Sequence, residues 1–191
     1  DSWQLCLNVF YNEVEDYQFE LNGEGMDYYL ENADEVSIYG IEIDSLWFLG
    51  GGWTFAAAYG LTESEFQKVS ILPSLVGKPV TFVPDQSLSL VLAHELDNGL
   101  SYQIGSRTIG KTYFWDNTGI NQNDMIDSYT LLDAQIGYNF KDWYFNIFGT
   151  NLTNEEYYTS LVSHLKSPEI TAAPGVVGSP RVIGLSISKE F

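Results

Sequence analysis

Residues 181–191 read RVIGLSISKEF, and their apolar side chains recur mostly at every second position. The apolar set comprises Ile183, Leu185, Ile187 and Phe191. Because side chains alternate along a β-strand, this spacing places an apolar face opposite a face of mostly small or polar residues. Such a strand fits a soluble sandwich, where the apolar face meets a core. It equally fits an outer-membrane barrel, where that face meets lipid and the polar face lines the lumen.

The composition narrows the class of protein. The 191 residues are enough for one sizeable domain, and aromatic residues make up 15% of them. No apolar run reaches the length of about 18 residues that a transmembrane helix needs. A barrel strand needs only about 10 alternating residues, so a membrane protein is still compatible with the sequence. The first residue is Asp1, which indicates a processed chain or a fragment.

The charge and the reactive side chains exclude several functions. The formal net charge of -18 disfavours binding to a phosphate backbone. Cys6 is the only cysteine, so neither an internal disulfide nor a cysteine-based zinc site is expected. His94 and His164 are far apart in the sequence, and no Ser-His-Asp grouping, GxSxG motif or phosphate-binding glycine loop is present. We therefore expect no enzyme activity, no catalytic residues, no cofactor and no metal site.

The alternating pattern of the last segment recurs along the chain and predicts eight strands. Their expected ranges are 3–11, 36–48, 53–62, 86–96, 100–113, 129–140, 143–152 and 181–191. Odd-numbered residues form the apolar face in the first three and last two strands. Even-numbered residues form it in the three strands between them.

The connections between these strands alternate in length. Short turns at residues 50–52, 97–99 and 141–142 alternate with much longer segments. Aromatic residues gather beside the short turns: Trp47, Trp53, Phe140, Trp143 and Phe191. Outer-membrane barrels have short periplasmic turns, long extracellular loops and aromatic girdles at both interfaces, whereas a soluble sandwich gives no reason for one-sided loop lengths. The predicted fold class is therefore an all-β, antiparallel transmembrane β-barrel.

The sequence also resembles a known family. Residues 129–158 read YTLLDAQIGYNFKDWYFNIFGTNLTNEEYY, which resembles the C-terminal barrel of TonB-dependent outer-membrane receptors. The segments YGIEI at 39–43, PDQ at 84–86 and the closing strand at 180–191 are similar to that family and follow its order. A terminal aromatic residue such as Phe191 resembles the signal by which bacterial barrels are recognised for assembly.

This resemblance implies a fold, a function and partners. Members of the family carry an N-terminal plug domain inside a 22-stranded barrel and take up scarce nutrients, with energy supplied through TonB. It implies that residues 1–191 are the C-terminal third of a receptor in the outer membrane of a Gram-negative bacterium, without the plug and with both ends in the periplasm. The nutrient implied is an iron–siderophore complex. The partners implied are the remaining strands and plug, TonB through the N-terminal part, lipid and lipopolysaccharide, and the barrel assembly machinery through the strand ending at Phe191.

A free-standing eight-stranded barrel with a structural or adhesive role is the alternative. Eight strands are enough to close a barrel with side chains filling the interior, and Asp1 is compatible with signal-peptide cleavage. The inward residues are mostly small or polar, which together with the resemblance favours the larger barrel. The sequence upstream of Asp1 separates the two hypotheses, because a plug domain indicates transport and a signal peptide indicates the small barrel.

Alternation also assigns four carboxylates to the lumen, namely Glu42, Asp44, Asp133 and Glu190. Three roles fit this position: part of a translocation wall, contact with a plug, or hydration in a polar lumen. We favour hydration. Arg107 is expected to face the lumen as well, where each of these carboxylates is a candidate ion-pair partner.

Three other features have a functional and a simpler interpretation. The acidic residues between Glu13 and Glu35 lack the spacing of a calcium loop, which favours a solvated acidic loop over a cation site. Aromatic residues at extracellular strand ends either stack on a ligand or form the outer girdle, which we favour: Tyr113, Phe114, Trp115, Tyr157 and Tyr158. Asn151-Leu152-Thr153 matches the glycosylation pattern, and we interpret this match as a false positive.

Overall fold

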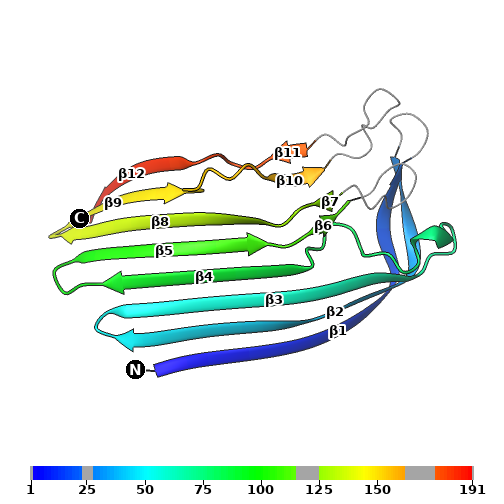
Figure 1. Ribbon diagram of the computed structural model, residues 1–191, viewed down its shortest axis with the longest axis horizontal. Helices are drawn as coiled ribbons and strands as arrows, with labels where there is room; N and C mark the ends of the chain where they lie inside the picture. Colours follow the sequence, from blue (N-terminus) through cyan, green and yellow to red (C-terminus); the bar gives the residue numbers. More distant parts are fainter. Residues whose placement is uncertain (1, 23–27, 115–124, 162–174, 191) are drawn as a thin grey trace.

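The computed structural model describes residues 2–22, 28–114, 125–161 and 175–190. Eight strands form one antiparallel sheet in chain order (Figure 1). They are β1 (Ser2–Asn22), β2 (Tyr28–Gly50), β3 (Trp53–Lys68), β4 (Gln86–Glu95), β5 (Leu100–Ile109), β8 (Tyr129–Phe140), β9 (Trp143–Thr150) and β12 (Val182–Lys189). The connections hold the hairpins β6 (Thr112–Tyr113) with β7 (Met125–Ile126) and β10 (Tyr158–Leu161) with β11 (Gly175–Val177), and the short 3₁₀ helix η1 (Pro73–Leu75).

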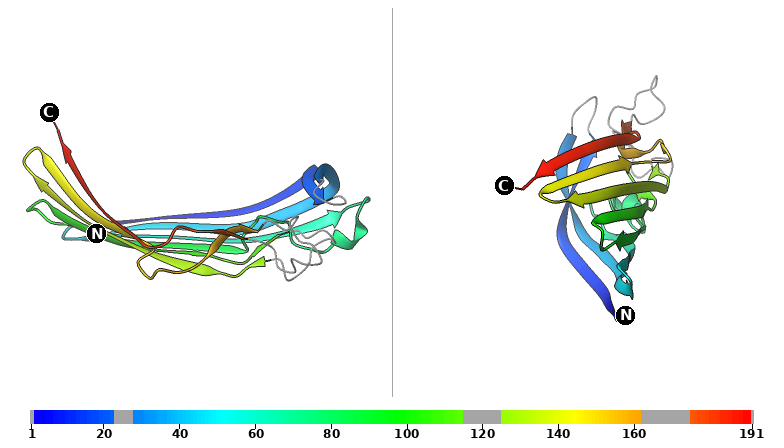
Figure 2. Two further views of the ribbon diagram at one scale, coloured as in Figure 1. Left: turned by 90° about the horizontal axis from the view of Figure 1, so that it is seen from above. Right: turned by 90° about the vertical axis from the view of Figure 1, so that its left-hand side faces the viewer.

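The eight predicted strands are therefore confirmed, and the fold is an all-β antiparallel sheet. The sheet is curved and open (Figure 2), and within the described residues β1 and β12 pair with only one neighbour each. None of the described residues belongs to a helix long and apolar enough to cross a membrane.

The strand register confirms the predicted division into two faces. Directly paired residues of neighbouring strands share a face, so the ladder can be followed across the sheet. Leu7 pairs with Ile43, Ile43 with Tyr59, and Tyr59 with Leu88. Near the other edge of the sheet, on the same face, Ile136 pairs with Ile147 and Ile147 with Leu185. One side of the sheet is thus a continuous apolar band.

The start of β1 and the end of β12 lie at the same end of the sheet as the short turns (Figure 1). The turn between β2 and β3 uses Gly50, Gly51 and Gly52 at φ values of 79°, 57° and 83°, which glycine adopts without steric cost. The predicted aromatic girdle lies beside these turns, where Trp47 pairs with Phe55 and Phe140 with Trp143. Phe191 lies outside the described residues.

The acidic stretch is not a loop, and that prediction is wrong. β1 continues to Asn22 and β2 begins at Tyr28, so most of residues 13–35 are paired strand. The charged side chains suggested a solvated loop because charges are excluded from a lipid-facing strand. Beyond the apolar band the strands leave the lipid, so this exclusion no longer applies.

Two predicted strand ends also need correction. The strand expected at 100–113 is divided in two, because β5 ends at Ile109 and the short strand β6 begins at Thr112. The strand expected at 143–152 ends at Thr150, because Asn151 takes a left-handed conformation with a φ of 48°.

Candidate functional site

The polar face of the sheet is the candidate functional surface. Its ladder sets Asn8, Glu42, Gly60, Ser87, Ile109 and Tyr129 side by side in one row. The next row holds Cys6, Asp44, Ala58, Ser89, Arg107 and Leu131. Because β3 and β4 contribute only small side chains to these rows, the surface is hollowed between β2 and β5.

The hollow consists of two adjoining depressions. One depression of about 360 Å³ is lined by Glu42 and Asp44 on one side and by Arg107 on the other. A neighbouring depression of about 400 Å³ contains Cys6 and the alanines of β3. The arrangement is a polar trough with negative charge on β2 and positive charge on β5.

The four predicted lumen carboxylates are not brought together. Glu42 Oε2 accepts a hydrogen bond from Asn8 Nδ2 at 3.0 Å and lies with Asp44 in the trough. Asp133 instead accepts a hydrogen bond from the Asn151 backbone N–H at 2.8 Å, which gives it a structural role. Glu190 follows β12, and its backbone N–H donates to the carbonyl of Asp142 at 2.9 Å.

Arg107 does not form the suggested ion pair with a lumen carboxylate. It makes no ion pair within 4.0 Å with any residue that the structure describes. Three strand spacings of about 4.8 Å separate β2 from β5, or roughly 14 Å, so the side chain faces Glu42 and Asp44 across the trough. The negative charges of Glu42 and Asp44 and the positive charge of Arg107 therefore lie on opposite sides of the trough, which stays open between them.

The predicted extracellular aromatics do not form an outer girdle together. The ring of Tyr157 stacks on Tyr129, with centroids 4.5 Å apart, and Tyr129 belongs to the polar face. Phe114 is only 2% exposed and packs edge-on against Phe82 at 4.9 Å. Tyr113 lies in β6 and Tyr158 in β10, while Trp115 lies outside the described residues.

Within the described residues, the outer girdle contains a pair that sequence reasoning did not assign to it. The rings of Tyr11 and Tyr39 stack on the apolar face with centroids 6.3 Å apart. They lie at the end of the apolar band that is farther from the short turns. Tyr39 Oη donates to Glu63 Oε2 at 2.6 Å. The next row, Glu13, Ser37 and Glu65, is polar, which marks the upper limit of the apolar band.

Asn151 makes three side-chain hydrogen bonds, and sequence reasoning missed this role. It is 3% exposed, and its Nδ2 donates to the carbonyls of Glu155 at 2.9 Å and Ser179 at 3.1 Å. Its Oδ1 accepts from the Glu155 N–H at 2.8 Å. The amide nitrogen that a glycan would need is therefore buried and occupied. The only sequence signal for this role was the family-like motif itself.

A continuous apolar face opposite a polar, hollowed face is the pattern of a transmembrane β-barrel wall. Residues 1–154 match the family model described as TonB dependent receptor-like, beta-barrel. The chain belongs to this family, whose members are outer-membrane transport receptors of Gram-negative bacteria rather than enzymes.

Solved structures share the fold at low identity. The ferric yersiniabactin uptake receptor FyuA from Yersinia pestis is 21% identical with a TM-score of 0.80, over 99% of this chain and 28% of that receptor. The siderophore receptor PiuA from Acinetobacter baumannii is 18% identical with a TM-score of 0.73, over 97% and 25%. The copper transporter OprC is 16% identical with a TM-score of 0.74, over 100% and 29%. The chain thus spans roughly a quarter of the length of these proteins.

Proposed function

We propose that this chain is the C-terminal barrel segment of a receptor that takes up a scarce nutrient across the outer membrane, with an iron–siderophore complex as the nutrient. The observation that carries the proposal is the two-faced, open sheet, whose polar face contains a trough and whose fold matches a ferric yersiniabactin uptake receptor and a siderophore receptor. The copper transporter has the same fold, so a copper complex is the competing nutrient.

Uptake by the parent bacterium tests the nutrient. Cells with and without the parent receptor gene are given ⁵⁵Fe bound to a hydroxamate, a catecholate or a hydroxycarboxylate chelator, and separately ⁶⁴Cu. We expect receptor-dependent uptake of at least one iron chelate, abolished by an uncoupler because transport draws energy from the inner membrane. Receptor-dependent uptake of copper alone would replace the iron proposal.

The proposed partners follow from the same assignment. The remaining barrel strands and the plug of the receptor would complete the barrel, and TonB would act through its N-terminal part. Lipid and lipopolysaccharide would cover the apolar band, and the barrel assembly machinery would bind the C-terminal residues that include β12 and Phe191. The polar face described above is the surface that a plug would meet.

The two sheet edges support the assignment as a segment. β1 has 21 residues and β12 has 8, so the two edges are poorly matched for pairing with each other. Unpaired backbone N–H and C=O groups cost several kcal/mol each in lipid, so both edges need partner strands. In the proposed receptor β12 pairs with the first barrel strand and β1 with the strand that precedes it.

Refolding tests this assignment against the free-standing barrel. Residues 1–191 are expressed alone and refolded in detergent, and we expect aggregation unless the remaining strands are supplied as a second polypeptide. A heat-modifiable, protease-resistant monomer with β12 paired to β1 would instead establish the small barrel.

A further inference from the structure

The sheet carries a second packed unit beyond the membrane. β1, β2 and β3 continue past the outer girdle at Tyr11 and Tyr39, and residues 69–85 fold back beside them (Figures 1 and 2). The connecting residues pack against the polar side of the strands, because Val36 and Phe66 pair with each other on that face. In the assembled barrel this is the side of the lumen.

The contact between the strands and residues 69–85 is a hydrophobic core. The side chains of Val36, Phe66, Val69, Leu75 and Val80 are each no more than 1% exposed. The first two belong to the strands and the last three to the connection, so the core exists only while the connection is docked. Burial of large apolar side chains is the main favourable term in such packing.

The backbone of β1 is shaped to supply this core. Residues of odd number in β1 lie on the outer face up to Glu15, yet Tyr17 and Phe19 contact the core. Asp16, which lies between Glu15 and Tyr17, has a φ of 54°, a left-handed conformation that marks the position where the alternation of faces changes. The rings of Tyr17 and Phe19 meet Phe66 edge-on at 6.2 Å and 5.8 Å.

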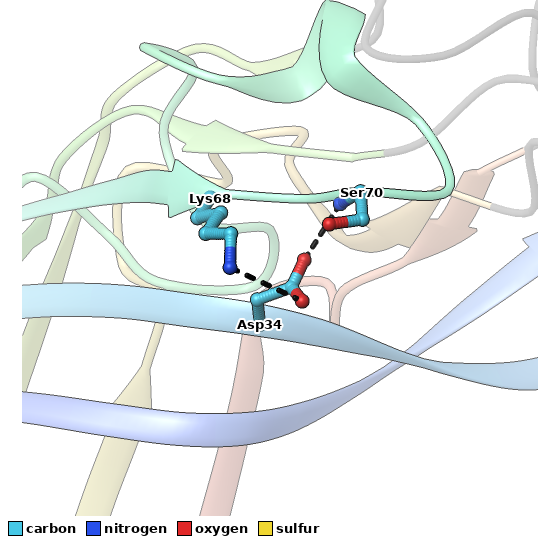
Figure 3. Close-up of polar contacts among 3 residues, drawn as sticks. All are labelled: Asp34, Lys68 and Ser70. Atoms are coloured by element: carbon cyan, nitrogen blue, oxygen red, sulfur yellow. Dashed lines mark hydrogen bonds and ion pairs between the residues drawn. The ribbon is translucent and has the colours of Figure 1, made fainter.

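Hydrogen bonds fix the connection along its length. At its start, the Ser70 N–H donates to Asp34 Oδ2 at 2.6 Å, and Lys68 Nζ lies 3.8 Å from Asp34 Oδ1 (Figure 3). In the middle, the Phe66 N–H donates to the Lys78 carbonyl at 3.0 Å. At its end, the Phe82 N–H donates to the Tyr113 carbonyl at 3.0 Å.

We propose that residues 69–85 are a fixed wall of the extracellular mouth that remains docked throughout transport, so that the mouth opens and closes elsewhere. A lid would have to expose this core and break these hydrogen bonds in each cycle. The proposal rests on the proposed transport function for its cycle, whereas the docked state of the free receptor can be measured without any nutrient.

Amide hydrogen exchange of the full receptor tests docking. We expect residues 69–80 to be protected as strongly as β2, and Leu75→Ala to raise their exchange at least tenfold. Val76→Ala is the matched control, because the Val76 side chain is 47% exposed and its loss should leave exchange unchanged. Fast exchange of residues 69–80 in the unsubstituted receptor would overturn the proposal.

A reversible cross-link tests movement during transport. In a Cys6→Ser background, the pair Asp34→Cys and Ser70→Cys replaces the hydrogen-bonded clasp with a disulfide. Uptake of the ⁵⁵Fe chelate identified above is then compared before and after reduction, with each single cysteine as control. We expect rates within twofold of each other. Loss of uptake on oxidation and recovery on reduction would identify a moving lid. If the unsubstituted receptor takes up no chelate, the transport function fails while the exchange result still decides the docking.

Discussion

Replacing Ile136 with arginine should impair assembly far more than the same change at its neighbour Gln135. Ile136 is 54% exposed on the apolar face, between Tyr102 of β5 and Ile147 of β9. Gln135 lies on the polar face and pairs with Gln103 and Phe148. The two positions are adjacent in β8, so they lie at nearly the same height in the membrane on opposite faces of the sheet.

The magnitude follows from that height. Ile136 is four residues from Phe140, the last residue of β8 before its turn. At about 3.4 Å per residue and a tilt of about 40°, it lies roughly 10 Å from the turn, near the middle of an apolar band about 25 Å tall. An arginine facing lipid at that depth costs about 2–4 kcal/mol, or about 30- to 700-fold in the folding equilibrium.

Gln135→Arg should cost under about 1 kcal/mol, because the lumen side is polar and the hydrogen bond lost, from Gln135 Nε2 to Gln103 Oε1, is already long at 3.5 Å. The assay is denaturant titration of the full receptor refolded into lipid vesicles, together with its heat-modifiable fraction in cell membranes. Equal stability and equal membrane levels of the two variants would refute the assignment of the faces.

Three further outcomes are expected. Asn151→Gly removes three buried side-chain hydrogen bonds, while glycine still adopts the left-handed backbone conformation of this position. It should lower the free energy of unfolding by about 1–3 kcal/mol in the same titration, and an unchanged value would contradict the anchoring role of Asn151. Phe191→Asp should reduce outer-membrane levels of the receptor while Phe191→Tyr preserves them, and equal immunoblot levels would argue against the assembly signal. The hydrogen bond from the Ser70 N–H lowers the pKa of Asp34 below its ordinary value of 3.8, so the clasp stabilises the fold above that pH and is lost as pH falls through the lowered pKa. Exchange of the Ser70 amide, corrected for its intrinsic pH dependence, should stay slow from pH 8 to 5 and rise only below about pH 4, with Asp34→Asn as the pH-insensitive control.

The strands and their faces were predictable because the information is local. Residues 129–140 alternate at a period of two, and the structure gives β8 the same bounds. The turn at 50–52 was equally legible, because three consecutive glycines favour positive φ. Local pattern therefore determined which side chains share a face, and the family resemblance determined which barrel they belong to.

Features that depend on partners distant in the chain needed the tertiary structure. The charged residues after Tyr11 are typical of a loop, yet in the structure they continue as paired strand. Leu75 and Val80, from a segment about 50 residues away in the chain, pack against these strands in a common core. Asn151 is part of a motif in the sequence, but its buried role depends on the carbonyl of Ser179, which is 28 residues away in the chain. Arg107 had candidate partners by face alone, and only the strand order placed it across a trough from them. Alternation along one strand determines the face on which a side chain lies. The distance from that side chain to its partners depends on which other strands and loops pack beside the strand.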